Sequence, residues 1–230
     1  MIRFLGLIRR RPGLTFDAFT DHWRTTHRNL VLEFSTPGPI SGYVQNRRVP
    51  DALPGLVSDY DGSPELWIRD WEGLGELGAS ERFQYIANDD SELFIDMPPI
   101  SFLTKTVFES GYSRSDVVGK IKLMLFWQRP KKEDSSGKSL EKGWQTKTTP
   151  LLLPQAKPLR LERDAAIAPP GGNLEECEFL GVESSWWPDE ASLTAAWNSR
   201  ALDIGPAPSA LIVVREEVAC PPSGFDMLVR

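Results

Sequence analysis

The order of predicted secondary-structure elements occurs twice in this chain of 230 residues, and this repeat constrains the fold more than any other feature. The first copy begins with the apolar segment IRFLGLIRR, which RPG ends, a pattern typical of a strand that runs into a turn. The second copy begins with KIKLMLFWQRP, which also ends in Arg-Pro. Self-similarity at a period near half the chain predicts two copies of one unit.

The first copy predicts two helices and four strands. Thr15 is the expected N-cap of the first helix, because apolar or aromatic residues then recur at spacings of three and four: Phe16, Phe19, Trp23, His27 and Leu30. Strands are predicted at 42–49, 65–71 and 100–109, and a second, glycine-weakened helix at 72–90. The order β-α-β-β-α-β is that of a ferredoxin-like domain, an α+β fold in which both helices cover one face of an antiparallel sheet.

The second copy has diverged from the first. A polar insertion, KKEDSSGK, precedes a predicted helix at 139–153, and a strand at 177–187, a helix at 188–202 and a closing strand at 209–218 follow. We therefore expect a first unit at 1–110, a linker at 111–119, and a second unit with a C-terminal tail at 120–230. Both histidines of the chain lie in the first unit.

Composition and charge exclude several classes of function. Hydrophobic residues at 40% and charged residues at 25% are typical of a globular protein, and a net charge of −6 argues against nucleic acid as a partner. No apolar segment approaches the roughly 20 residues of a membrane span, so a membrane is not expected as a partner. Two cysteines and no secretory signal favour a reducing, cytoplasmic location.

Three segments carry a resemblance to a known family: TFDAFTDHWRTTH, GYVQNRRV and YDGSPELWIRDWEGL. On these the chain resembles a tandem member of the EthD family, within the dimeric α+β barrel superfamily. The resemblance implies two ferredoxin-like units whose sheets pack into a barrel, here within one chain, as a monomeric pseudo-dimer or as a homodimer. It also implies pockets between each sheet and its own helices. The family's W-x3-H pattern maps onto Trp23 and His27, and the second copy has Thr148 at the matching position, which implies one working pocket and one lapsed pocket.

The two histidines have different expected roles. At about 100° per residue, His27 falls within the apolar stripe of the helix, whereas His22 lies well away from its centre. His27 is either a general base in a pocket or a buried histidine with satisfied hydrogen bonds, and the resemblance favours the base. Residues at i and i+5 do not share a face of an α-helix, so we expect no metal site. His22 is either a partly exposed helix residue or a residue that lines the rim of the pocket and contacts the substrate.

Further candidates come from the strands. Tyr43 and Asp61 are predicted to orient His27 or a substrate hydroxyl, although Asp61-Gly62 is also a good turn dipeptide. Trp67 is expected with Phe19 and Trp23 in the wall of the pocket, although strand alternation leaves open which face of 65–71 meets the helices. Adjacent residues point apart, so Asp89 and Asp90 are interpreted as a polar stretch that ends a helix.

These features favour an enzyme that acts on a small apolar compound, aromatic or polyketide-like, by acid–base chemistry. Neither a metal, a flavin nor a nicotinamide is expected as a cofactor. We favour a lyase or dehydratase, because removing a proton next to a carbonyl needs little beyond one tuned base. The alternatives are a non-catalytic ligand-binding or accessory protein in an oxygenase pathway, and a cofactor-free monooxygenase or isomerase.

Overall fold

A computed structural model describes residues 1–56, 58–129, 157–199 and 210–222. The chain divides into two compact units. Unit 1 comprises Met1–Arg48, Asp59–Leu103 and Glu216–Arg230, and unit 2 comprises Val49–Ser58 and Thr104–Arg215. The helix predicted at 139–153, with Thr148, and the polar insertion before it lie outside the described residues.

The sheet of unit 1 places β3 (Gly62–Ile68) between β1 (Ile2–Leu7) and β2 (Ile40–Arg48), all antiparallel. Phe4 of β1 and Tyr43 of β2 are both paired with Leu66 of β3. Directly opposed residues point to the same side of a sheet, so these three side chains share one face. Trp67, the neighbour of Leu66, therefore points to the other face.

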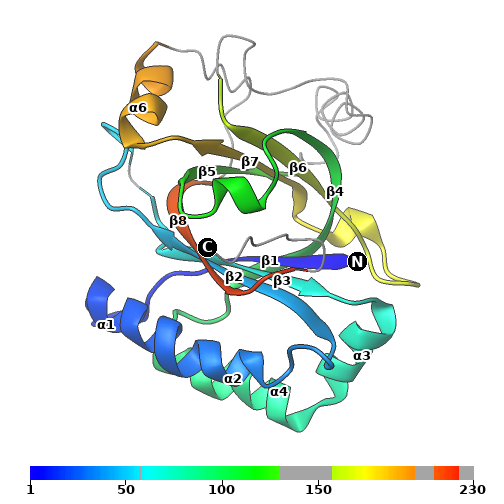
Figure 1. Ribbon diagram of the computed structural model, residues 1–230. Helices are drawn as coiled ribbons and strands as arrows, with labels where there is room; N and C mark the ends of the chain where they lie inside the picture. Colours follow the sequence, from blue (N-terminus) through cyan, green and yellow to red (C-terminus); the bar gives the residue numbers. More distant parts are fainter. Residues whose placement is uncertain (57, 130–156, 200–209, 223–230) are drawn as a thin grey trace. The chain divides into compact units, whose positions relative to one another are not determined.

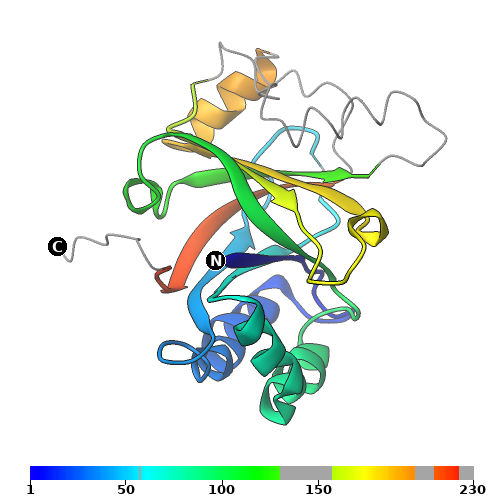
Figure 2. The ribbon, with the colours of Figure 1, turned by 90° about the vertical axis from the view of Figure 1, so that its right-hand side faces the viewer.

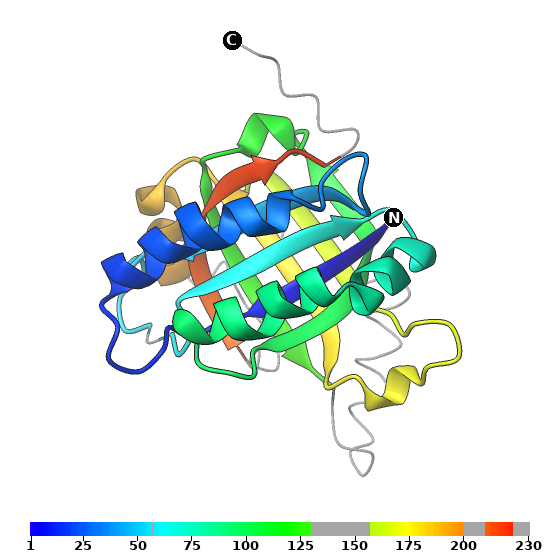
Figure 3. The ribbon, with the colours of Figure 1, turned by 90° about the horizontal axis from the view of Figure 1, so that it is seen from below.

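Two helical segments cover one face of this sheet, and Figures 1 and 3 show them lying over it, roughly along the direction of the strands. The first consists of α1 (Phe16–His22), a π-helical turn η1 (Trp23–His27) and α2 (Arg28–Leu32). The predicted cap is confirmed, since the Thr15 hydroxyl accepts a hydrogen bond from the Ala18 N–H at 3.1 Å.

The second helical segment is interrupted where one helix was predicted. It consists of α3 (Trp71–Ala79), α4 (Glu81–Tyr85), a second π-helical turn η2 (Ile86–Asp90) and a 3₁₀ turn η3 (Ser91–Leu93). Ser80 separates α3 from α4 because its backbone is extended, and its hydroxyl caps α4 by accepting from the Phe83 N–H.

Unit 2 contains β5 (Ile121–Gln128), β6 (Arg160–Ala166) and β7 (Phe179–Trp187), with β7 between the other two. Helix α6 (Glu190–Asn198), capped by Asp189, packs beside β7 (Figure 2). Two short 3₁₀ turns, η4 (Ser115–Val117) and η5 (Leu174–Glu176), belong to the same unit. The strand β6 was not predicted from the sequence.

Strands β4 (Ile100–Gly111) and β8 (Ala210–Cys220) each run from one unit into the other. The eight strands form a closed barrel in the order β1-β3-β2-β8-β5-β7-β6-β4. Around the barrel, β4-β1-β3-β2 is followed by the corresponding β8-β5-β7-β6, which repeats one strand order twice. The α+β barrel of two similar units within one chain is therefore confirmed.

An apolar cluster fills the helix-facing side of the unit 2 sheet. It joins β5, β6 and β7 to Leu193 of α6 and includes Leu123, Leu125 and Trp127. The buried pair Arg163 and Glu183 lies on the same side, because Glu183 is paired with both Leu125 and Arg163. Arg163 Nη2 is 2.8 Å from Glu183 Oε2.

In the described part of the chain, no helix has the length and apolar character needed to cross a membrane.

Candidate active site

A cavity of about 580 Å³ lies in unit 1 between the helices and the sheet. This volume is within the range of pockets for small molecules, about 300–1,000 Å³. The lining is mostly apolar and comes from both helical segments and from strands β1 to β4; it includes Phe4, Ile8, Trp23, Val31, Leu66, Ile68, Leu77, Phe83, Ile86, Phe94 and Met97. The polar lining residues are fewer: His27, Tyr43, Gln84, Asn88, Ser91 and Ser101. The cavity therefore suits an apolar molecule with a few oriented polar groups.

His27 is the polar residue of the cavity wall that is bonded to a buried carboxylate. Its Nδ1 lies 2.7 Å from Oδ2 of Asp90, and the exposed fractions of the two side chains are 13% and 2%. The bond uses Nδ1, so Nε2 is the ring nitrogen left to meet a molecule in the cavity.

His22 binds the same carboxylate as His27, so the expectation that the two histidines lie on different faces was wrong. His22 Nε2 is 3.1 Å from Asp90 Oδ1. The reason is η1, where the Arg28 N–H donates to the Trp23 carbonyl, five residues earlier. A π-helical turn closes its hydrogen bonds between i and i+5, which brings residues five apart onto one side.

Asp90 is the site residue that the sequence analysis missed. The interpretation of Asp89 and Asp90 as a polar helix end assumed regular geometry, but Asp90 closes the second π-helical turn and is buried against the first. Of these two aspartates, Asp89 is exposed and Asp90 is buried. The sequence held one signal for this role. Asp90 lies in the same unit as both histidines, and a carboxylate is a common hydrogen-bond partner of an imidazole.

The charge of Asp90 fixes the tautomer of His27. Burial of the carboxylate raises its pKa, but the hydrogen bonds and positive charge of His27 and His22 outweigh burial, and the net pKa is below the ordinary value. An ionised carboxylate accepts hydrogen bonds and cannot donate them. His27 must therefore carry a proton on Nδ1, which leaves a lone pair on Nε2 when the ring is neutral.

Tyr43 contributes a neutral phenol to the cavity. Its oxygen accepts hydrogen bonds from Trp23 Nε1–H at 3.1 Å and from Gln45 Nε2–H at 3.0 Å. Burial raises its pKa to about 12, although these two hydrogen bonds act in the opposite direction. Tyr43 thus stays protonated at neutral pH and can donate its O–H to a ligand, whereas it cannot serve as a base.

The family comparison covers the segment that holds these groups. Residues 11–98 match the EthD domain. The matched residues include four polar groups of the site: His22, His27, Tyr43 and Asp90. The match ends at residue 98, before strands β5, β6 and β7 of unit 2.

Solved structures of the same fold carry a range of names. An anthrone oxidase-like protein has a TM-score of 0.60 at 10% identity, covering 95% of this chain and 93% of that one. A protein proposed to be a monooxygenase, from Lactobacillus acidophilus, has a TM-score of 0.45 at 8% identity, with 95% and 93% covered. The chlorite dismutase of Candidatus Nitrospira defluvii has 0.45 at 12% identity, with 93% and 90% covered. The likeness to the anthrone oxidase-like protein, at 10% identity, shows a shared fold and nothing of the reaction. No curated protein matches the sequence significantly.

Trp23 lines the cavity, whereas Phe19 is not among the lining residues and packs against Trp23, with 5.6 Å between the ring centroids. Gly62 lets the Trp23 ring approach the sheet, because a Cβ on this glycine would lie 2.4 Å from the ring. Gly62 is the first residue of β3, and the Trp23 ring packs against it. The glycine at this position is therefore explained by the close approach of Trp23, and the Asp61-Gly62 dipeptide does not need to form a turn.

Asp61 lies at the ends of β1 and β2 and is not among the residues of the cavity wall. Its carboxylate accepts from the Arg10 N–H at 2.9 Å, from Arg10 Nη1 at 2.8 Å and from Arg48 Nη2 at 2.9 Å. Trp67 is likewise outside the cavity wall, on the opposite face of β3, where the Arg3 guanidinium lies 4.7 Å from its ring. The structure therefore brings His27, Tyr43 and Trp23 together and leaves Asp61 and Trp67 elsewhere.

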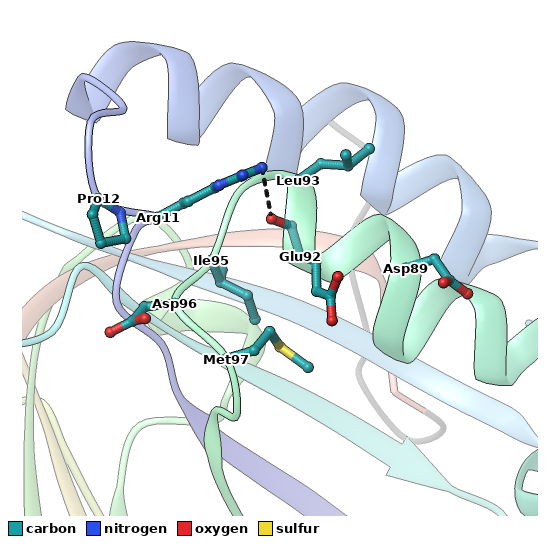
Figure 4. Close-up of a pocket in the computed structure, with 8 residues that line it drawn as sticks. All are labelled: Arg11, Pro12, Asp89, Glu92, Leu93, Ile95, Asp96 and Met97. Atoms are coloured by element: carbon teal, nitrogen blue, oxygen red, sulfur yellow. Dashed lines mark hydrogen bonds between the residues drawn. The ribbon is translucent and has the colours of Figure 1, made fainter.

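A smaller groove of about 380 Å³ adjoins the cavity of unit 1, and Figure 4 shows the residues that line this groove. Ile95 and Met97 belong to the walls of both. Charged side chains surround the groove, and Arg11 Nη1 donates to the Glu92 carbonyl at 3.3 Å. Across the residues with described positions, no group of three or more His, Cys, Asp or Glu side chains has an arrangement that could hold a metal ion.

Proposed function

We propose that the EthD domain of unit 1 is an acid–base enzyme that removes a proton from a carbon next to a carbonyl in a small apolar, aromatic or polyketide-like compound. The observation that carries the proposal is the bond from His27 Nδ1 to buried Asp90, in the wall of an apolar cavity. A histidine held in this way presents a basic nitrogen to the ligand, as in other sites where a carboxylate orients an imidazole.

Three groups have defined parts in this reaction. His27 Nε2 accepts the proton from the carbon, and Asp90 stabilises the imidazolium that forms. The O–H of Tyr43 donates to the carbonyl oxygen, where negative charge develops as the enolate forms. Desolvation inside the cavity strengthens both interactions.

The same groups complete a dehydration, the lyase-type outcome that we favour. The enolate re-forms its carbonyl, and a hydroxyl on the next carbon leaves with the proton that His27 had taken, so that the net products are an unsaturated ketone and water. The steps balance without an oxidant or reductant.

Two small ketones test the proposal. β-Tetralone reports proton removal alone, as exchange of its acidic hydrogens in D₂O followed by NMR. The aldol of benzaldehyde and acetone reports dehydration, as the appearance of the ultraviolet absorption of benzalacetone. We expect the wild-type protein to catalyse the exchange.

His27→Asn is the decisive variant. The Asn amide can reproduce the Nδ1–H donor to Asp90 while it removes Nε2, so the fold is retained and the base is lost. We expect the exchange rate to fall by about 10²- to 10⁴-fold, the usual contribution of a general base. Binding of β-tetralone with exchange no faster than in His27→Asn would overturn the enzyme in favour of a ligand-binding or accessory protein.

A further inference from the structure

We infer that His22 is a positioning residue of this site, which holds the Asp90 carboxylate so that Asp90 in turn fixes His27. The inference rests on the proposed function for its catalytic meaning, although the geometry can be tested without turnover. His22 does not line the cavity, and its side chain is 24% exposed, compared with 13% for His27. The order from the cavity outward is therefore His27, Asp90, His22.

The two imidazoles share the carboxylate one oxygen each. Within the described residues, His27 is the hydrogen-bond donor to Oδ2 and His22 is the donor to Oδ1. A buried carboxylate that loses one of two donors bears the cost of the unsatisfied oxygen, and it can turn to recover a bond. Without His22, Asp90 would no longer be held in the orientation that suits His27.

The ring of Phe94 packs against both imidazoles. Its ring centroid is 4.9 Å from that of His22, in a stacked geometry, and 4.9 Å from that of His27, in a tilted one. Phe94 is itself 2% exposed. Both imidazoles thus rest on one buried ring, which limits their movement relative to each other.

Both helical segments have a π-helical turn at this contact. His22 and His27 are five apart, which only a π-helical turn aligns, and Asp90 ends a second π-helical turn. π-helical turns are rare and occur often at functional sites. Two of them that meet at one carboxylate indicate that both histidines, and not His27 alone, are part of the site.

The consequence concerns the tautomer of His27. If Asp90 turns away, neutral His27 is free to carry its proton on Nε2, where it would present a donor to the cavity and not a base. His22 therefore determines, through Asp90, what fraction of His27 is ready to accept a proton.

Nitrogen-15 NMR of the full-length protein measures this fraction, because the shifts of Nδ1 and Nε2 distinguish the two tautomers. In the wild type we expect the Nδ1–H form of His27. His22→Leu removes the donor to Asp90 and should give a mixture of tautomers. His22→Gln is the matched control, since its amide nitrogen can take the place of Nε2 and should restore the wild-type pattern.

The exchange of β-tetralone provides the second readout. We expect the rate at saturating ketone to fall about tenfold in His22→Leu, with KM unchanged, the size of effect given by one hydrogen bond to a charged group. We expect His22→Gln to remain within about twofold of the wild type. If His22→Leu does not fold, as judged by circular dichroism, His22→Phe answers the same question, because its ring can keep the stacking on Phe94 while it lacks a donor to Asp90, and it should also give mixed tautomers.

The outcomes separate this inference from the proposed function. An unchanged His27 tautomer in His22→Leu, or a His22→Gln variant that behaves like His22→Leu, would overturn the positioning role whatever the rates are. Mixed tautomers in His22→Leu together with a wild-type protein that exchanges no ketone would retain the positioning role and reject the proposed acid–base reaction.

Discussion

The helix-facing sides of the two sheets differ in the polar groups that they bury. In unit 1, this side carries Tyr43, bonded to neutral donors, and it borders a cavity. In unit 2, the corresponding side carries the Arg163–Glu183 ion pair within an apolar cluster of leucine and tryptophan side chains. Both sides are buried, so burial alone does not distinguish them.

The difference shows what each arrangement can offer a ligand. The Arg163 and Glu183 side chains are 2% and 1% exposed, and in such a buried ion pair each charge compensates the other for the loss of water. A phenol that only accepts hydrogen bonds still has a proton to donate. The phenol of Tyr43 in unit 1 therefore has the proton that the proposed reaction needs for a carbonyl oxygen.

The largest effect is expected from breaking the unit 2 pair. Arg163→Met leaves Glu183 as a buried charge without this partner, and we expect a loss of about 3–5 kcal/mol in the free energy of unfolding, measured with urea. Arg163→Met with Glu183→Leu should recover most of this loss. β-Tetralone exchange per folded molecule should be unchanged; a specific loss of exchange would show that unit 2 takes part in the chemistry.

The next effect concerns the phenol of unit 1. Tyr43→Phe removes the donor to the enolate oxygen, and we expect the exchange rate to fall by about 10²- to 10³-fold. Trp23 and Gln45 also lose an acceptor, at a cost of about 1–3 kcal/mol of stability. Tyr85→Phe, on a side chain that is 43% exposed, is the matched control. Equal rates in the two variants would remove Tyr43 from the mechanism.

A smaller effect is expected when the cavity is narrowed. Ala87 lies on η2 in the cavity wall, so Ala87→Phe should weaken binding of β-tetralone about tenfold, equivalent to about 1.4 kcal/mol. Ala79→Phe, at an exposed position at the end of α3, controls for the added ring. Calorimetry measures both affinities, and equal values would place the ligand elsewhere.

The smallest effect concerns pH. The pKa of Asp90 is lower in the folded protein, so the stabilisation that it provides is complete above the ordinary aspartate value of about 4 and is lost as pH falls through the folded value. Urea unfolding from pH 7 to pH 3 should therefore show a steeper acid loss in the wild type than in Asp90→Asn. Parallel curves would contradict the ionised carboxylate between the histidines.

Sequence patterns predicted β1 to β5, β7 and β8, and they missed β6. The segment RLERDAA has Arg160, Glu162, Arg163 and Asp164 within seven residues, yet all four are buried. Their burial depends on partners that are distant in sequence, such as Glu183 for Arg163. A local pattern treats such residues as exposed, so the strand could not be read from it.

The sequence by itself determined the element order of the first unit, the Thr15 cap and the placement of His27 on the apolar side of its helix, because these depend on neighbours within a few residues. Only the tertiary structure decided that His22 and His27 share Asp90. That contact needs a π-helical turn in each of the two helical segments. Asp90 is 68 residues from His22 and 63 residues from His27 in the sequence, and the three meet only because both segments pack on one sheet. Tertiary packing likewise assigned Tyr43 to the cavity and placed Asp61 and Trp67 outside it, because the face that a strand turns to its helices is set by the register of the whole sheet.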